Sequence, residues 1–246
     1  MKYLLLIITL ILSSPSWSET ISGDELVTNP SDGLVYKKFT SDPFTGSTTP
    51  SSENPSKGSY KKGKKHGVWE TFHDNGLLYS KGNYKNGEQN GLWEEYHENG
   101  QLKVKGVIKG ENQHEIMKYV VKENRHGLWE EYFENGQLKV RETWKDGYQD
   151  GLSKVYRENG QLLFVRNYKD EKPNGRDEKY YENGQLFLVS NYKDGKLHGL
   201  YIMYHENGQL LSKGTWKDWE RVGLWKYYDE DGSLQRTETW IDGVKQ

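Results

Sequence analysis

A tight Asn-Gly or Asp-Gly dipeptide recurs through this chain, and its spacing constrains the fold more than any other feature. The intervals between successive dipeptides are 24, 36, 24, 24, 24 and 24 residues. A fixed period of this length is typical of proteins that stack copies of one supersecondary unit. The dipeptides are Asn75-Gly76, Asn99-Gly100, Asn135-Gly136, Asn159-Gly160, Asn183-Gly184, Asn207-Gly208 and Asp231-Gly232.

Each unit predicts a β-hairpin. Its consensus is approximately G-L-W-x-x-Y-x-E-N-G-Q-L-x-x-x-G-x-Y-K-D-G-K-x-H, with aromatic and aliphatic residues alternating on both sides of Asn-Gly. Asn-Gly favours a two-residue type I′ turn, because both residues tolerate positive φ. A second turn signal, such as Lys85–Gly87 or Lys193–Gly195, follows half a period later. The unit therefore reads as strand, tight turn, strand and looser turn, with no room for a helix.

The predicted turn also fixes a strand register. A two-residue loop would place Trp93 opposite Gly106 and His97 opposite Leu102. The indole of Trp93 would then lie over a residue without a side chain. The same construction places a glycine opposite the aromatic residue in two other units, in the pairs Trp69–Gly82 and Tyr201–Gly214. In two more units it places a glutamate there, in the pairs Trp129–Glu142 and Trp225–Glu238.

These units predict an all-β fold of antiparallel hairpin repeats, about 24 residues each, that form an elongated meander sheet or open solenoid. One hairpin alone buries too little surface to be stable, so the units must stack. The array is expected to span residues 60–246, with an insertion near 107–124 that breaks the period. The inserted residues either lengthen two strands or leave the array as a loop.

The composition agrees with a thin structure. Only 33% of the residues are hydrophobic, yet 13% are aromatic, whereas disordered chains are poor in aromatic residues. The net charge of −2, with both signs interspersed, predicts no attraction to nucleic acid. The chain has no cysteine, which excludes disulfides, thiolate metal sites and a cysteine nucleophile.

The first 59 residues differ from the array. Residues 1–18 have a lysine, a short apolar run and small residues before Glu19, which predicts a secretory signal peptide; the alternative is a retained membrane anchor. We therefore expect an exported protein that is located in the periplasm, or outside the cell or in the cell envelope. Residues 19–59 are predicted to be a leading segment and a linker rich in Ser, Thr and Pro, with a short strand at Leu34–Phe39.

The repeat resembles a known family. The segments "YKNGEQNGLWEEYHENGQL" (Tyr84–Leu102) and "YKDGKLHGLYIMYHENGQL" (Tyr192–Leu210) are similar to MORN-type repeats in their bacterial variant form, grouped as the YwqK family antitoxins. "DGLVYKKFTSDPFTG" (Asp32–Gly46) resembles the N-terminal segment of such proteins. The resemblance covers residues 32–246 and implies a non-enzymatic role in which the chain holds a toxin partner.

Side chains that could carry chemistry are spread along the array. Histidines recur before the "HG" glycine and before the Asn-Gly turn, but equivalent residues in successive hairpins lie two strands, or about 9.5 Å, apart. That separation is too large for one metal ion, whose ligand bonds are about 2 Å long. The glycines follow turns rather than a phosphate-binding loop, and no motif of a hydrolase or metalloprotease is present. We expect no enzymatic activity, metal or cofactor.

The aromatic residues are the best candidates for binding. A Trp, or Tyr201 in its place, is followed three residues later by Tyr, and this offset places the two rings on opposite faces of a strand. One set can pack inward while the other contacts a partner, although both sets could serve packing alone. The candidate partner-binding residues are Trp69, Trp93, Tyr96, Trp129, Tyr132, Tyr201, Tyr204, Trp225 and Tyr228.

Three functions remain open on the sequence. The first is a protein-binding module with a protein partner, which the family resemblance extends to an antitoxin or immunity protein. The second is a scaffold of the cell envelope or a glycan-binding protein, which the export signal and the aromatic rows favour. The third is an enzyme, which the missing motifs argue against.

Overall fold

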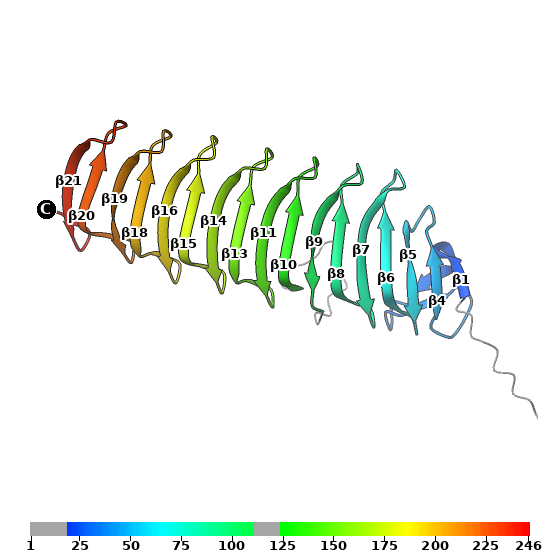
Figure 1. Cartoon of the computed structure of the whole chain (residues 1–246). Helices are drawn as coiled ribbons and strands as arrows, with labels where there is room; N and C mark the ends of the chain where they lie inside the picture. Colours follow the sequence, from blue (N-terminus) through cyan, green and yellow to red (C-terminus); the bar gives the residue numbers. More distant parts are fainter. Residues whose placement is uncertain (1–18, 111–123) are drawn as a thin grey trace, which may run out of the picture.

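The computed structural model of the chain describes residues 19–110 and 124–246 (Figure 1). The predicted signal peptide, residues 1–18, lies outside the described residues. The described strands are, in chain order, β1 (Glu19–Ser22), β2 (Leu26–Thr28), β3 (Val35–Lys37), β4 (Gly46–Thr49), β5 (Ser56–Lys61), β6 (Lys64–Phe72), β7 (Leu78–Lys85), β8 (Glu88–Tyr96), β9 (Leu102–Ile108), β10 (Arg125–Tyr132), β11 (Leu138–Lys145), β12 (Tyr148–Gln149), β13 (Gly151–Tyr156), β14 (Leu162–Lys169), β15 (Lys172–Tyr180), β16 (Leu186–Lys193), β17 (Lys196–Leu197), β18 (Gly199–Tyr204), β19 (Leu210–Lys217), β20 (Glu220–Tyr228), β21 (Leu234–Ile241) and β22 (Val244–Lys245).

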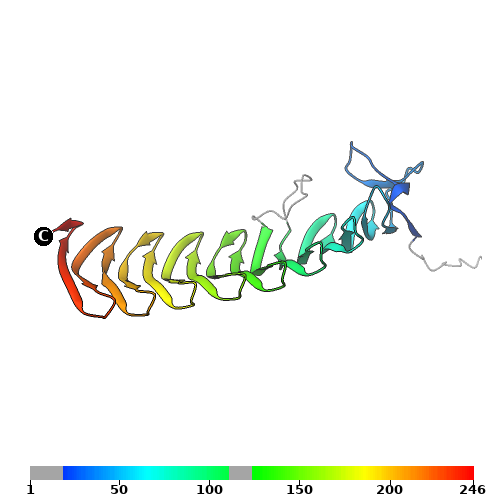
Figure 2. The same cartoon turned by 90° about the horizontal axis from the view of Figure 1, so that it is seen from above.

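The strands form one long sheet in which hairpin follows hairpin. From β4 onward the strands pair antiparallel in chain order, except that β11 pairs with both β12 and β13 and β16 with both β17 and β18. Strand β1 pairs parallel with β4. A separate two-stranded sheet, β2–β3, and the 3-10 turn η1 (Gly23–Glu25) lie at the N-terminal end. Figure 1 shows the hairpins side by side in one row, and Figure 2 shows that each hairpin is bent, so the sheet is curved across its width. The predicted all-β fold of antiparallel repeats is confirmed.

The N-terminal segment contributes more to this sheet than its composition suggests. The predicted short strand at Leu34–Phe39 corresponds to β3, which pairs with β2. The segment expected to be a linker instead contains β4 and β5, which extend the sheet beyond the first repeat. Small residues there have a packing role, because the ring of Trp69 lies where a side chain on Gly58 would be. The linker prediction was therefore wrong for β4 and β5.

The insertion does not lengthen the strands on either side of it. Strand β9 ends at Ile108 and β10 begins at Arg125, and these two residues are paired directly in the sheet. The two hairpins therefore meet as other successive hairpins do. The extra residues lie in the connection between β9 and β10, of which 111–123 fall outside the described residues.

The Asn-Gly turn differs from the predicted two-residue loop. In the second unit Gly100 has a φ of 84°, but Asn99 is not in the left-handed region that a type I′ turn requires. The backbone N–H of His97 donates to the carbonyl of Gln101, at 2.8 Å, so the loop is longer than predicted. The side chain of Asn99 accepts a hydrogen bond from the N–H of Gln101, at 2.9 Å, which is an Asx turn.

The predicted register holds in the body of the hairpin and fails near the turn. Trp93 pairs with Gly106 and Glu95 with Val104, as predicted. A β-bulge follows Glu95, so Tyr96, rather than His97, pairs with Leu102. The other predicted pairs, Trp69–Gly82, Tyr201–Gly214, Trp129–Glu142 and Trp225–Glu238, are also present.

The residue that makes room for the indole at the tryptophan position lies in the strand that precedes it in sequence. That strand belongs to the preceding hairpin or is β5. Trp129 pairs with Gly106 across the junction of β9 and β10, and a Cβ atom on Gly106 would lie 1.8 Å from the indole. A Cβ atom on Gly214 would lie 2.1 Å from the ring of Trp225. The glutamates that face these two indoles within their own hairpins therefore do not disrupt the packing. The match in size between an indole and a glycine is therefore made between successive hairpins and not within one hairpin.

This packing predicts a strong coupling between the two residues at one junction. Gly106→Ser should lower the free energy of unfolding by about 1–3 kcal/mol, because the added atoms overpack the site. The loss should be smaller in a Trp129→Tyr background, since the chain has Ser190 and Tyr201 at equivalent positions. Urea unfolding of the two single variants and the double variant measures this coupling. An equal loss in both backgrounds would contradict it.

Candidate interaction surface

One face of the sheet, which we call the inner face, carries the large indoles. Trp129 and Trp225 are each only 1% exposed. Because the sheet has a single layer, other side chains on the same face must cover these rings. The guanidinium of Arg125 lies 4.2 Å from the ring centroid of Trp129, and that of Arg221 lies 4.5 Å from Trp225. These cation–π contacts close the inner face over its aromatic core.

In the middle of the array, polar side chains replace the glycine and tryptophan at the junctions. Asp177 is 0% exposed, and its carboxylate accepts a hydrogen bond from Arg166 Nε at 2.8 Å and one from Ser190 Oγ at 3.2 Å. Burial alone would lower the pKa of Arg166, but the hydrogen bond and charge of Asp177 raise it above its usual value. This pair is a buried, partnered ion pair with a structural role.

A second polar contact lies one junction earlier. Gln149 Nε2 donates to Glu142 Oε1 at 2.9 Å, and Ser153 Oγ donates to the same oxygen at 3.4 Å. Burial, followed by the charge of Glu131, raises the pKa of the Glu142 carboxyl, whereas Arg125 lowers it. The carboxylate form of Glu142 is therefore disfavoured in the folded chain.

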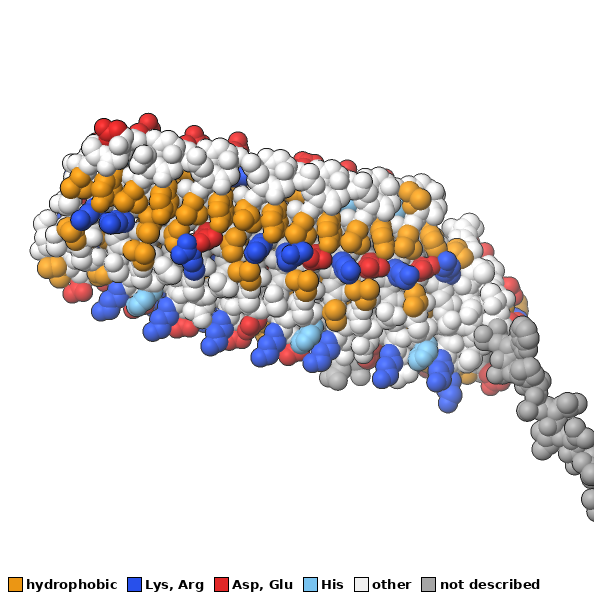
Figure 3. Space-filling model, in the orientation of Figure 1, with side chains coloured by type: hydrophobic (Ala, Val, Ile, Leu, Met, Phe, Trp, Pro, Cys, Tyr) orange, Lys and Arg blue, Asp and Glu red, His pale blue; other side chains and the backbone are white. Residues whose placement is uncertain are grey.

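The opposite face, which we call the outer face, carries tyrosines and charged residues. Tyr132 donates to Glu130 at 2.8 Å, and Tyr180 donates to Glu178 at 2.6 Å. Burial and this hydrogen bond raise the pKa of Tyr132 to about 12, so its hydroxyl stays protonated as a donor. In the view of Figure 3 a continuous band of hydrophobic side chains runs along the array, with a row of charged side chains beside it.

The structure separates the predicted binding residues between the two faces. Trp69, Trp129 and Trp225 are buried, and the ring of Tyr201 packs against Trp225 with centroids 5.8 Å apart. The inner-face candidates are Trp69, Trp93, Trp129, Tyr201 and Trp225, and the outer-face candidates are Tyr96, Tyr132, Tyr204 and Tyr228. This agrees with the predicted offset. The four outer-face tyrosines are half-buried, and so are Trp93 and Tyr201 on the inner face, so these six residues rather than the buried tryptophans are the candidates for contact with a partner.

A row of exposed aliphatic residues was missed in the sequence. In nearly every unit the residue before the tryptophan position lies on the outer face with 39–53% of its surface exposed. An apolar side chain repeated at a position where folding does not bury it points to a role outside folding. The "GLW" motif carries this signal, because neighbouring residues of a strand face opposite sides. This leucine row comprises Val68, Leu92, Leu128, Leu152, Leu200 and Leu224, with Arg176 in the remaining unit.

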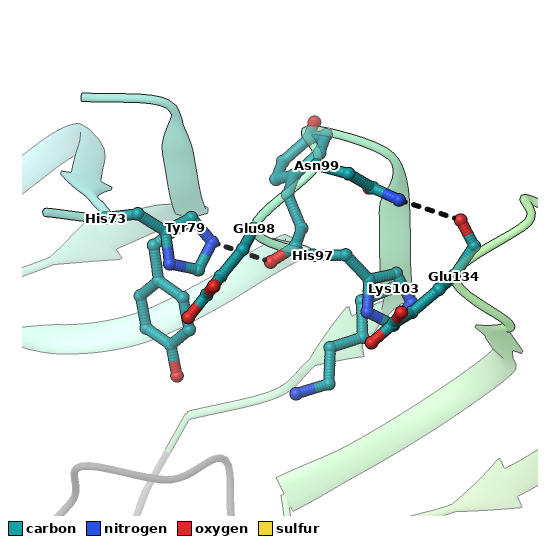
Figure 4. Close-up of a pocket in the computed structure, with 8 residues that line it drawn as sticks. His73, Tyr79, His97, Glu98, Asn99, Lys103 and Glu134 are labelled. Atoms are coloured by element: carbon teal, nitrogen blue, oxygen red, sulfur yellow. Dashed lines mark hydrogen bonds between the residues drawn. The ribbon is translucent and has the colours of Figure 1, made fainter. Parts of the chain in front are cut away.

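At the Asn-Gly end of the sheet, side chains join each hairpin to the next. His73 Nε2 donates to the backbone carbonyl of Tyr96 at 3.0 Å, and Asn99 Nδ2 donates to that of Glu134 at 2.9 Å (Figure 4). The asparagine contact recurs at Asn75, Asn135, Asn183 and Asn207. The histidine position donates likewise from His97, Arg157, Tyr181 and His205. The asparagine thus caps its own turn and binds the next hairpin.

A shallow depression of about 540 Å³ lies among these contacts. Figure 4 shows that His73 and Asn99, which line it, direct their donors to backbone carbonyls rather than into open space. Within residues 19–110 and 124–246, no group of three or more His, Asp or Glu side chains is placed to hold a metal ion. The same part of the chain has no helix with the length and apolar character needed to cross a membrane.

The inter-hairpin contact of asparagine predicts a position-dependent cost. Asn99→Asp keeps the acceptor that caps the turn but loses the donor to Glu134, so it should cost about 1 kcal/mol of unfolding free energy. Asn159 is the matched control, because its Nδ2 donates only to Gln161, at 3.3 Å, within its own turn. Asn159→Asp should therefore have little effect. Chemical denaturation of both variants tests this, and equal losses would contradict it.

Glu142 predicts a dependence on pH. A carboxyl whose pKa is raised by folding stabilises the fold at low pH, and this contribution is lost as the pH rises through the folded value. Glu142→Gln stays neutral and can still accept from Gln149. The variant should thus be more stable than the parent at neutral pH, with the difference vanishing below about pH 4. Thermal unfolding across pH measures it, with the exposed Glu98→Gln as control; a constant difference would refute the assignment.

The comparisons with known proteins agree with this architecture. A family model described as MORN repeat variant matches residues 65–86, 89–109, 125–146, 149–170, 173–194, 197–218 and 221–242. Each match covers one hairpin with the Asn-Gly or Asp-Gly turn that joins its two strands. No curated protein sequence matches the chain. Because the matches together cover more than half of its length, the chain belongs to the MORN repeat variant family.

Proposed function

We propose that this chain is an exported, non-enzymatic repeat protein that binds another protein along its outer face. The observation that carries the proposal is the leucine row, in which six aliphatic side chains remain 39–53% exposed. The inner face is closed by cation–π contacts, and the Asn-Gly end is occupied by contacts between hairpins. The outer face is therefore the long surface that folding does not use.

The chemistry of the outer face suits a protein partner. Leu92 and Val107, which pair across strands β8 and β9, are 41% and 38% exposed and give this hairpin an apolar contact point of two side chains. Tyrosines at the far end of the same strands add large rings with a polar tip, a residue type enriched at interfaces. Salt-bridged pairs such as Glu130–Arg141 lie between the two rows and can provide a polar rim.

The family resemblance adds a narrower form of this proposal. In that form the partner is a toxin, and the chain is the antitoxin or immunity protein that holds it. Export would place the meeting of the two proteins in the cell envelope. A captured partner that is toxic alone and harmless when co-expressed with the chain would support this form.

A second candidate is a glycan-binding or scaffolding role in the cell envelope. The tyrosine row on the outer face favours it, because aromatic rings with fixed hydroxyl groups can pack against sugar rings. Retention of the chain on purified peptidoglycan, lost when Tyr132 and Tyr204 are replaced by Ala, would support this role over the first.

The first experiment captures the partner and then measures its affinity. The chain from Glu19 to Gln246 is used to isolate interacting proteins from cell-envelope extract, and the purified partner is titrated by calorimetry. Leu92→Ser and Leu128→Ser should each weaken binding by about 1 kcal/mol or more if the row contacts the partner. Neither change should affect folding, because exposed positions tolerate substitution.

Two equally exposed apolar residues outside the row serve as controls. Val27 and Ile241 are 48% and 57% exposed and lie at opposite ends of the molecule. Val27→Ser and Ile241→Ser should leave the affinity unchanged. If all four variants weaken binding equally, or if none does, the leucine row is not the binding surface.

A further inference from the structure

We propose that Asn159 is a site of spontaneous covalent modification, at which the folded chain deamidates faster than at the equivalent turns of the other hairpins. Asparagine followed by glycine is especially prone to this reaction, because glycine has no side chain to shield the backbone nitrogen that attacks the amide. Six turns at one end of the sheet contain this dipeptide. Their asparagines are Asn75, Asn99, Asn135, Asn159, Asn183 and Asn207.

Local sequence and backbone do not distinguish these turns. From Asn99 onward the five asparagines stand in the same five residues, Glu-Asn-Gly-Gln-Leu. In all six turns the glycine N–H donates to the carbonyl three residues before it, at 2.8–3.1 Å. The asparagine Oδ1 accepts from the N–H two residues after it, at 2.9 or 3.0 Å. The attacking nitrogen and the amide oxygen are thus held alike.

Three further asparagines precede glycine but have a different backbone. Asn90 and Asn174 lie within strands β8 and β15. Asn86 lies in a turn at the opposite end of the sheet and has a φ of 55°. The six turns at the Asn-Gly end are therefore the set in which rates can be compared.

The amide nitrogen is where Asn159 differs. Asn135 Nδ2 donates to the carbonyl of Glu158 at 3.1 Å, and Asn183 Nδ2 donates to that of Glu206 at 3.0 Å. The same contact holds the amides of Asn75, Asn99 and Asn207, and Figure 4 shows it for Asn99. Both ends of these amides are thus fixed to main-chain atoms. Asn159 Nδ2 donates instead to Oε1 of Gln161, at 3.3 Å, which belongs to its own turn.

The reaction needs only the chain and water. The backbone nitrogen of Gly160 attacks Cγ of Asn159, and a new N–C bond forms while the Cγ–Nδ2 bond breaks. Nδ2 leaves as ammonia, which carries away the proton of the Gly160 N–H. Water then opens the succinimide ring at one of its two carbonyls and gives aspartate or isoaspartate. The side chain must rotate toward Gly160 before the attack, so a hydrogen bond that holds Nδ2 to the next hairpin slows the reaction.

The fold protects the amides that it uses. Deamidation at Asn135 or Asn183 would replace a donor to the next hairpin by a carboxylate, which cannot donate and would leave that carbonyl without this partner. Aspartate at position 159 would lose only the contact with Gln161 and would keep the oxygen that accepts from the Gln161 N–H. The Asn-Gly end would thus gain a negative charge beside Glu158 without losing a contact of this kind between hairpins.

Rates measured at three turns of one molecule test the proposal. The chain from Glu19 to Gln246 is kept folded at mildly alkaline pH, and samples taken over time are digested and analysed by mass spectrometry, which follows each asparagine separately. Asn159 should deamidate about fivefold faster than Asn135 and Asn183, its counterparts in the two adjacent hairpins, which is the factor that one ordinary hydrogen bond represents. The same chain unfolded in urea should deamidate at equal rates at the three positions.

Hydrogen exchange separates the amide contact from a general opening of the turn. The N–H groups of Gly136, Gly160 and Gly184 have equivalent acceptors, so they should exchange at similar rates in the folded chain. Faster exchange at Gly160 would mean that the whole turn opens and would remove the amide contact as the cause. The proposal also fails if Asn159 is no faster than its two counterparts in the folded chain, or if its advantage persists in urea. The proposed function does not depend on this outcome, because it rests on the outer face.

Discussion

The structure depends on a match of side-chain size across each junction between hairpins. Where an indole crosses the junction, as Trp93, Trp129 and Trp225 do, the residue beneath it is Gly82, Gly106 or Gly214, and a Cβ atom there would overlap the ring. A single-layered sheet has no second layer to bury its side chains, so the stacking of hairpins must supply the core. One large ring over one bare backbone position does this with few residues, which explains how a chain with 33% hydrophobic residues can fold.

The junctions without this match show a different way to satisfy the same constraint. Arg166 and Asp177 form an ion pair where other junctions have glycine and tryptophan, and Ser190 completes the hydrogen bonds of the buried carboxylate. A buried ion pair adds little net stability, but losing one partner is costly, and its best-documented use is to fix register. In an array of near-identical hairpins, one hairpin could pair with the wrong neighbour. A junction whose side chains match only each other prevents this mispairing.

Much of this fold follows from the sequence because the evidence for it is periodic. The 24-residue spacing and the alternation along each strand predict the hairpins and the pairing of Trp93 with Gly106 correctly. The turn is longer than Asn-Gly suggests because the asparagine side chain caps it as an Asx turn, and this local contact forms at Asn159 as well as at Asn99. The other errors arise where the deciding contact is not local. Strands β4 and β5 form because the first repeat needs a neighbour. The burial of the indoles, and hence the choice between the two aromatic rows, depends on Arg125 and Arg221 lying above them.

The two faces and two ends of the sheet thus have different constraints, and this bears on where specificity can reside. Residues of the inner face and of the Asn-Gly end are tied to their neighbours in the next hairpin, so a change at one junction requires a change at its partner. Outer-face residues have no such requirement, and there the repeats differ. Arg176 interrupts the leucine row, and the residue that pairs with the row within each hairpin varies, for example Asn83, Val107 and Thr143. A partner that reads this face would therefore meet a different surface at each hairpin, although the hairpins share one backbone. Repetition provides the length of the surface, and the variation that folding leaves free can provide its selectivity.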